Sequence, residues 1–196
     1  MGFNPDKNHR RSIRLKGYDY KQPGAYFVTI CTQNRECLFG DIVDGTTRLN
    51  DWGQMVQSVW NELPQHYPGV DIDAFVVMPN HIHGIIVLMD DHIVGATPRG
   101  CPVPGVPGQA QGPAPTMSLA DVVHRFKSLT TARFRHDVIQ NNWHPFHGRL
   151  WQRNYYEHVI RNESEWDRIR EYIAANPAQW DEDINNPKRI GDGHVE

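Results

Sequence analysis

The chain has 196 residues, 39% of them hydrophobic and 22% charged, and a formal net charge of −3. This length and composition suit one globular domain with its own core, so we expect a single domain over residues 1–196. The sequence has no apolar run near the roughly 20 residues of a membrane helix, and its polar start lacks the apolar stretch of a secretion signal. The three cysteines form no Cys-x-x-Cys pair, so we expect reduced thiols and a cytoplasmic protein.

The basic residues are concentrated in two regions. Residues 1–21 hold six Lys/Arg against two acidic residues, and residues 124–170 hold nine Lys/Arg and five His against five acidic residues. Because phosphate binding depends on local surface charge more than on the total, both regions are candidates for contact with nucleic acid. Scattered, solvated charges are the alternative interpretation.

Strands and one helix are predicted in the first half of the chain. β-Branched and aromatic residues predict a strand at residues 25–32, with the segment CLFGDIV (37–43) as its partner. Apolar residues at helical spacing from Asp51 predict an amphipathic helix that ends near Pro64. The segments DIDAFVVM and HIHGIIVLM predict two further strands, because Pro-Asn between them is typical of a turn.

The second half begins with a segment of unusual composition. Residues 95–116 carry six of the 14 prolines and five of the 16 glycines, which predicts an irregular insertion at about residues 95–117. Ser118 and Asp121 then have the spacing of a capping box, and apolar residues after them predict a second helix.

The last predicted elements are an extended or irregular segment and a helix. The segment RLWQRNYYEHVI (149–160) is extended or irregular, Asn162 and Glu165 predict the start of the helix, and Pro177 should end it. Together with the antiparallel hairpin, these elements predict an α+β fold, an antiparallel sheet with helices packed on one face.

Two histidines interrupt the apolar run VVMPNHIHGIIVL (76–88). In a strand, residues i and i+2 lie on one face about 6 to 7 Å apart, so His81 and His83 can reach one divalent ion while Ile82 faces the other side. Two imidazoles alone are too few for a usual metal site, so a further ligand is expected from elsewhere. Surface histidines without a metal are the alternative.

The last helix offers candidate partners for these histidines. Tyr172 and Asn176 are one turn apart on the same helical face, and the apolar stripe of the helix presses this side toward the sheet. Asn176 precedes Pro177 at the helix end, where its amide is available as a ligand. The alternatives are a core tyrosine with a bonded hydroxyl and an ordinary asparagine at a helix terminus.

Three motifs in this order, MPNHIHGII, WQRNYYEHVIRN and REYIAANP, resemble the HUH single-tyrosine transposases, in which a bulky apolar residue separates two histidines. The resemblance extends from about Gly24 to Trp180. The WQRNYYEHVIRN element favours the REP-associated tyrosine transposases over the insertion-sequence branch, and HRRSIRLKGYDY is similar to the N-terminal segment of one bacterial subgroup. The resemblance implies a ferredoxin-like antiparallel sheet with the HUH motif on a central strand and the tyrosine on a helix packed across it.

The resemblance also implies roles for individual residues. His81 and His83 would be metal ligands, Asn176 would stand where insertion-sequence members commonly have Gln as third ligand, and Tyr172 would be the nucleophile. The implied ion is Mg²⁺ or Mn²⁺. The implied activity is cleavage and rejoining of single-stranded DNA near hairpins through a 5′-phosphotyrosine intermediate. The sequence leaves open whether the protein is a monomer or a homodimer.

Basic and aromatic side chains are expected to hold the DNA by phosphate contacts and stacking. The candidates are Arg125, Lys127, Arg149, Arg153, Tyr155, Tyr156, His158 and Arg161. Tyr155 or Tyr156 is the alternative nucleophile, and His158 is an alternative ligand. The alternative function is that of a non-catalytic hairpin-binding protein that retains an HUH domain. An unrelated metallo-phosphoesterase would need more His and Asp ligands than the sequence offers.

Overall fold

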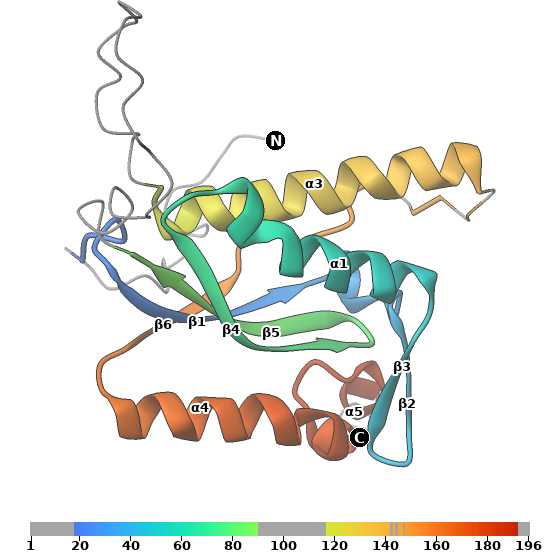
Figure 1. Cartoon of the computed structure of the whole chain (residues 1–196). Helices are drawn as coiled ribbons and strands as arrows, with labels where there is room; N and C mark the ends of the chain where they lie inside the picture. The colour runs from blue at the N-terminus through green and yellow to red at the C-terminus, as the bar shows by residue number, and fades with distance from the viewer. Residues whose placement is uncertain (1–17, 90–116, 142, 144, 147, 192–196) are drawn as a thin grey trace, which may run out of the picture.

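The computed structural model describes residues 18–89, 117–141, 143, 145–146 and 148–191 (Figure 1). The predicted insertion lies outside these residues except for Met117, as does most of the basic N-terminal segment. The described elements are β1 (Gly24–Cys31), η1 (Gln33–Arg35), β2 (Gly40–Val43), β3 (Thr46–Leu49), α1 (Asp51–His66), β4 (Val70–Met78), β5 (His81–Leu88), α3 (Leu119–Gln140), β6 (Tyr156–Ile160), α4 (Glu163–Ala175), η2 (Asn176–Glu182) and α5 (Pro187–Gly191). None of the described helices is both long and apolar enough to cross a lipid bilayer.

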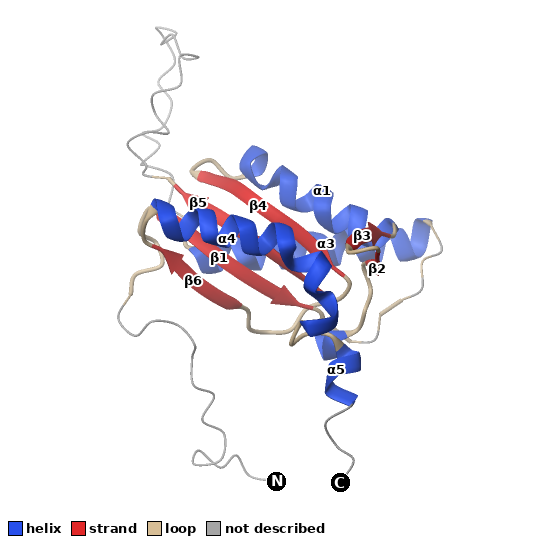
Figure 2. Cartoon of the chain, turned by 90° about the horizontal axis from the view of Figure 1, so that it is seen from below, coloured by secondary structure: helices blue, strands red, loops and turns tan. Residues whose placement is uncertain are grey.

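The main sheet is antiparallel and has four strands in the order β4-β5-β1-β6 (Figure 2). β5, which carries His81 and His83, is an internal strand between β4 and β1. The sequence predicts residues 37–43 as a partner of β1, but β2 pairs only with β3 in a separate hairpin. Both edges of β1 are occupied, by β5 and by β6, so no edge is left for that segment.

Helices cover both faces of the main sheet. α1 and α3 lie on one face and α4 lies on the other (Figure 1). The α+β class with an antiparallel sheet is therefore confirmed, but the helices are not confined to the one face that the sequence predicts. The reason is that β1 and β5 are buried along most of their length, as in a sheet whose two faces are both covered.

The ends of the helices follow the predicted signals in most places. The side chains of Asn50, Ser118 and Asn162 each accept a hydrogen bond from a backbone N–H in the first turn of the helix that follows. The capping box at Ser118 is complete. α1 continues through Pro64 to His66, because proline fits a helical φ and removes only one backbone donor near the helix end.

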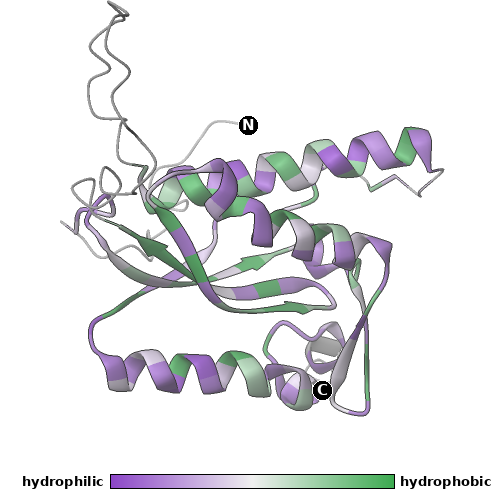
Figure 3. Cartoon of the chain, viewed as in Figure 1, coloured by the Kyte–Doolittle hydropathy of each residue, from purple (hydrophilic) through white to green (hydrophobic). Residues whose placement is uncertain are grey.

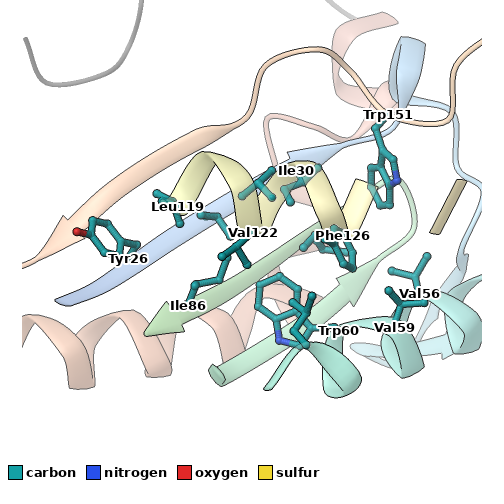
Figure 4. Close-up of a cluster of buried hydrophobic side chains, with 14 of the residues drawn as sticks. Tyr26, Ile30, Val56, Val59, Trp60, Ile86, Leu119, Val122, Phe126 and Trp151 are labelled. Atoms are coloured by element: carbon teal, nitrogen blue, oxygen red, sulfur yellow. The ribbon is translucent and has the colours of Figure 1, made fainter. Parts of the chain in front are cut away.

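The larger of two cores lies between the sheet and the α1/α3 layer (Figure 4). Trp60 of α1 stacks on Phe75 of β4, with ring centroids 4.5 Å apart, and meets Phe126 of α3 edge-on at 5.4 Å. Gly84 of β5 makes this packing possible, because a Cβ at this position would overlap Trp60 and would lie 3.0 Å from Phe75 Cδ2. Gly84, which follows the two histidines, thus leaves room for the Trp60 ring in the core on the opposite face of the sheet.

Gly84→Ala is expected to lower the free energy of unfolding by about 1–3 kcal/mol, because the added methyl group forces the Trp60 ring out of its stack. Urea unfolding followed by tryptophan fluorescence measures this loss. Trp60→Leu in the same chain should restore part of the stability, since the smaller side chain leaves room for the methyl group. Strictly additive losses in the double variant would contradict the proposed clash.

Candidate metal and nucleophile site

The two histidines are buried at the start of β5, on the sheet face that α4 covers. Their relative exposures are 0% for His81 and 2% for His83, and Ile82 between them belongs to the core on the opposite face. The two Nε2 atoms lie 3.0 Å apart. The sequence places the pair at the strand start near solvent, but the neighbouring C-terminal residues bury both rings.

Asn80 fixes the orientation and the tautomer of His81. The Asn80 amide nitrogen donates to two backbone carbonyls, those of Arg35 at 2.9 Å and Asn185 at 2.8 Å. The amide oxygen therefore faces His81 Nδ1 at 2.8 Å, and Nδ1 must carry the hydrogen. His81 Nε2 is consequently the unprotonated nitrogen, and it points toward His83.

His83 is held from its other side by Thr29 and Phe27 of β1. Its Nδ1 lies 2.8 Å from the Thr29 hydroxyl, and its ring stacks on Phe27 with centroids 5.5 Å apart. Burial lowers the pKa of each imidazole to about 3, with a smaller contribution from Arg35 for His81 and from His81 for His83. Both rings are therefore neutral at physiological pH, the form that binds metal ions.

Two further side chains with oxygen atoms, those of Asn176 and Asp183, come from the C-terminal part of the chain. Asn176, at the junction of α4 and η2, is 3% exposed, and its side-chain oxygen is buried with no hydrogen-bond partner among the described residues. Such an unpartnered acceptor is costly unless it binds something else. Asp183 contributes a carboxylate oxygen 3.5 Å from His81 Nε2, and ligand atoms of His81, His83 and Asp183 all lie within 4.8 Å of one another.

Tyr172 faces this site from α4. Its ring centroid is 5.3 Å from that of His83 and 5.9 Å from that of Phe27, and its side chain is 44% exposed. Burial raises the pKa of the phenol above its usual value, while a hydrogen bond from the Asn176 side chain lowers it. The hydroxyl is therefore protonated at neutral pH and needs assistance to act as a nucleophile.

α4 is fixed to the sheet at both flanks. On β4, the register shifts between Ile72 and Phe75, and Asp73 lies in this bulge. Its carboxylate accepts a 2.6 Å hydrogen bond from Trp166 and forms an ion pair with Arg170. The ion pair with Arg170 is the main reason that the pKa of Asp73 is lowered. On β6, His158 Nε2 lies 2.8 Å from Glu165. These contacts orient the face of α4 that carries Tyr172.

The site opens into a pocket of about 540 Å³. Its lining brings together residues from β1, β5, β6, α4 and two loops: Phe27, Thr29, Cys31, His83, Gln152, Asn154, Tyr155, Tyr156, Tyr172, Ile184 and Asn185. The pocket therefore holds one of the two histidines together with the candidate nucleophile.

Comparison with known proteins agrees with this arrangement. Residues 112–176, which include Tyr172 and Asn176, match the family described as "Transposase IS200 like". A protein of Haemophilus influenzae, named only as uncharacterized, is 42% identical over 185 residues, covering 92% of this chain and 95% of that protein. A second protein of the same organism, provisionally named a REP-associated tyrosine transposase, is 23% identical over 164 residues, covering 82% of this chain and 74% of its own length.

A solved structure shares the fold. It is the structure of a REP-associated tyrosine transposase bound to a REP hairpin, with a TM-score of 0.52 and 19% identity, and the match covers 85% of this chain and 73% of that one. The chain therefore resembles the REP-associated tyrosine transposases in sequence and in fold. The resemblance stated from the sequence motifs is thereby confirmed.

The alternative nucleophiles, Tyr155 and Tyr156, line the same pocket. Tyr156 is 49% exposed and meets Phe27 edge-on, with centroids 6.2 Å apart. Tyr155 is partly buried, and the Lys127 ammonium lies 5.3 Å from its ring centroid. Tyr172, by contrast, contacts the His83 ring directly, with centroids 5.3 Å apart. His158 pairs with Glu165 and lies outside the group of His81, His83 and Asp183.

The basic residues among the DNA-binding candidates fall into two groups. Lys127 is largely withdrawn from solvent, since its ammonium donates to the carbonyls of Gln152, Arg153 and Asn154 at 2.9 to 3.2 Å. Burial lowers its pKa to about 8. The Lys127 ammonium is therefore engaged by the loop before β6. The exposed basic candidates are Arg125, Arg149, Arg153 and Arg161.

Asn80→Ala is expected to lower the free energy of unfolding by about 1–3 kcal/mol, because one buried and one partly buried carbonyl lose their donor. It should also weaken Mn²⁺ binding by about 10- to 100-fold, since His81 loses the partner that sets its tautomer. Urea unfolding and calorimetric titration measure the two effects. Asn61→Ala, at an exposed position of α1, is the matched control and should change neither quantity.

Proposed function

We propose that this transposase is a metal-dependent endonuclease and transesterase that cleaves and rejoins single-stranded DNA near hairpins through a 5′-phosphotyrosine intermediate. The observation that carries the proposal is the meeting of Tyr172 with the buried histidine pair across one open pocket. Tyr172 and His83 line that pocket, His81 lies beside His83 on β5, and Asn176 follows Tyr172 by one helical turn. The whole chain, with its insertion, would form one such domain.

The residues present fit a divalent ion. His81, His83 and Asn176 would hold Mg²⁺ or Mn²⁺, and the Asn176 oxygen, buried without a partner, is the feature that a bound cation explains. When bound, the ion would polarise the scissile phosphate and neutralise the charge that develops during the reaction. Thr29 and Asn80 would keep both imidazoles in the required orientation.

The attack by Tyr172 determines which end of the cut DNA strand stays attached to the protein. The Tyr172 oxygen would form a bond to the phosphorus, the bond from phosphorus to the 3′-oxygen would break, and the phenol proton would end on that 3′-oxygen. The 5′ end would stay attached to Tyr172. Because the phosphotyrosine keeps the energy of the phosphodiester, a 3′-hydroxyl can reverse the step and rejoin the strand without ATP.

DNA with a hairpin is the proposed partner. The structural neighbour is bound to a REP hairpin. In this chain, Tyr156 is exposed at the pocket edge, where it can stack on an unpaired base, and Arg149 and Arg153 are exposed on the loop before β6. Single-stranded DNA is required because the scissile phosphate must reach Tyr172 inside the pocket.

Incubation with a labelled single-stranded hairpin oligonucleotide and Mn²⁺ tests the proposal. We expect a protein–DNA adduct that survives denaturing electrophoresis and carries the 5′ end of the cut strand, and we expect none in a chelator. Hairpins taken from repeats that flank the coding region are the preferred probes. Tight hairpin binding without any adduct under Mg²⁺ or Mn²⁺ would instead favour the non-catalytic binding protein.

A further inference from the structure

We propose that Asp183 is an additional, negatively charged ligand of the metal site, supplied by the C-terminal segment that follows η2. This inference rests on the proposed metal site and adds to it a residue that lies beyond the matched family segment, which ends at residue 176. Asp183 shares the site with His81 and His83, and its side chain is 7% exposed.

The position of the carboxylate relative to the His81 ring distinguishes a ligand from a supporting residue. A carboxylate that merely orients a metal-bound histidine accepts the N–H of the nitrogen that faces away from the metal. In His81 that nitrogen is Nδ1, and Asn80 already binds it. Asp183 instead lies near Nε2, the nitrogen that faces His83. It therefore shares the space in front of the two Nε2 atoms.

The distances match those between neighbouring ligands of one small cation. Adjacent ligand atoms about 2.1 Å from an octahedral ion lie about 3.0 Å apart. His81 Nε2 lies 3.0 Å from His83 Nε2 and 3.5 Å from the Asp183 carboxylate. One ion can thus contact all three side chains with only small shifts of their atoms.

The charge of the site also requires an acid. Two neutral imidazoles and one amide would leave a buried divalent cation without any anionic ligand, and Mg²⁺ and Mn²⁺ favour carboxylate oxygen. Among the described residues, Asp183 is the acidic side chain that shares a metal-capable cluster with the two histidines. It supplies the missing negative charge.

The contacts of the segment around Asp183 leave one oxygen of its carboxylate directed at the histidine pair. Its Oδ1 accepts the backbone N–H of Asn185 at 2.6 Å, which leaves Oδ2 directed at His81. Two hydrogen bonds hold the residues that follow Asp183. The Asn80 side chain donates to the Asn185 carbonyl, and the Arg35 side chain donates to the Ile184 carbonyl at 2.8 Å. The same asparagine that orients His81 therefore also anchors the segment that carries Asp183.

Calorimetric titration of the full-length protein with Mn²⁺ tests the proposal. Asp183→Asn keeps Oδ1 and the size of the side chain but removes the charge, so we expect Mn²⁺ affinity to fall at least about tenfold. Asp181→Asn, at an exposed position of the same segment, is the matched control and should bind Mn²⁺ as the wild type does. His81→Ala reports on the site itself and should lose binding.

The outcomes separate this inference from the proposed function. A wild type that binds no Mn²⁺ would overturn the metal site as a whole. If His81→Ala loses Mn²⁺ binding but Asp183→Asn binds Mn²⁺ as the wild type does, only the role of Asp183 is overturned. Faster DNA cleavage by Asp183→Asn at unchanged Mn²⁺ affinity would overturn that role as well. If Asp183→Asn does not fold, Asp183→Cys replaces it: a thiolate ligand should shift preference from Mn²⁺ toward Cd²⁺, relative to the wild type, and an unchanged preference would contradict ligation.

Discussion

Tyr172→Phe is expected to eliminate the covalent protein–DNA adduct while hairpin affinity stays within about twofold of the wild type. The change removes only the hydroxyl oxygen, and the ring keeps its edge contacts with His83 and Phe27. Because the Tyr172 ring meets that of His83, its hydroxyl is the one that we expect to attack the phosphate. Denaturing electrophoresis measures the adduct and a gel-shift titration measures the affinity.

Tyr156→Phe is the matched control for this experiment. Tyr156 lines the same pocket and is similarly exposed, but its described ring contact is with Phe27 rather than with a histidine. We expect its variant to form the adduct, with at most a modest loss of DNA affinity. An adduct that persists in Tyr172→Phe and disappears in Tyr156→Phe would show that Tyr156 on β6, and not Tyr172, is the nucleophile.

His83→Ala and His81→Ala are each expected to abolish cleavage and to lower Mn²⁺ affinity at least about 100-fold, because each removes one of two neighbouring nitrogen ligands. Hairpin binding should persist, since both rings are buried and do not belong to the exposed basic surface. Single-turnover cleavage at saturating DNA and calorimetric titration with Mn²⁺ provide the measurements.

His158→Ala is the control for these two variants. His158 lies on β6 and is half-buried against Glu165, outside the metal-capable cluster. Its loss should leave Mn²⁺ affinity unchanged. A fall in Mn²⁺ affinity comparable to that of His83→Ala would make His158 a ligand and would contradict the site described here.

Much of the fold is predictable from the sequence because its signals are local. The strands around Pro79 and the caps of α3 and α4 follow from turn chemistry and side-chain capping within a few residues. The coverage of both sheet faces is harder to predict. A buried strand with two covered faces shows a continuous apolar run, and such a run does not say how many faces carry helices.

The candidate site was predictable where motif and periodicity coincide, at His81, His83, Tyr172 and Asn176. Asn80 was treated only as a turn residue, because its donor role depends on carbonyls that are distant in the chain. Asp183 stands in the acidic run DED, which is typical of a solvated surface. Only the folded C-terminal segment distinguishes the third residue of this run from the first two.

Lys127 shows the opposite error. A lysine in a basic, aromatic stretch is a reasonable candidate for a phosphate contact, and the sequence cannot reveal that three carbonyls surround its ammonium. Arg125, Arg149, Arg153 and Arg161 stay exposed, in keeping with the general reluctance of guanidinium groups to be buried without a partner.

The two cores differ greatly in size, which makes stability unequal across the sheet. Among the described residues, twenty buried side chains form the core under α1 and α3, whereas only six form the core under α4. Those six are Ala25, Phe27, Ile85, Ile160, Ile169 and Ile173. With so little apolar surface beneath it, α4 should undergo local unfolding at a lower free energy than the rest of the domain. Amide hydrogens of α4 should therefore exchange sooner than those of α1, and on heating the protein should lose α4, which carries Tyr172, before the sheet melts.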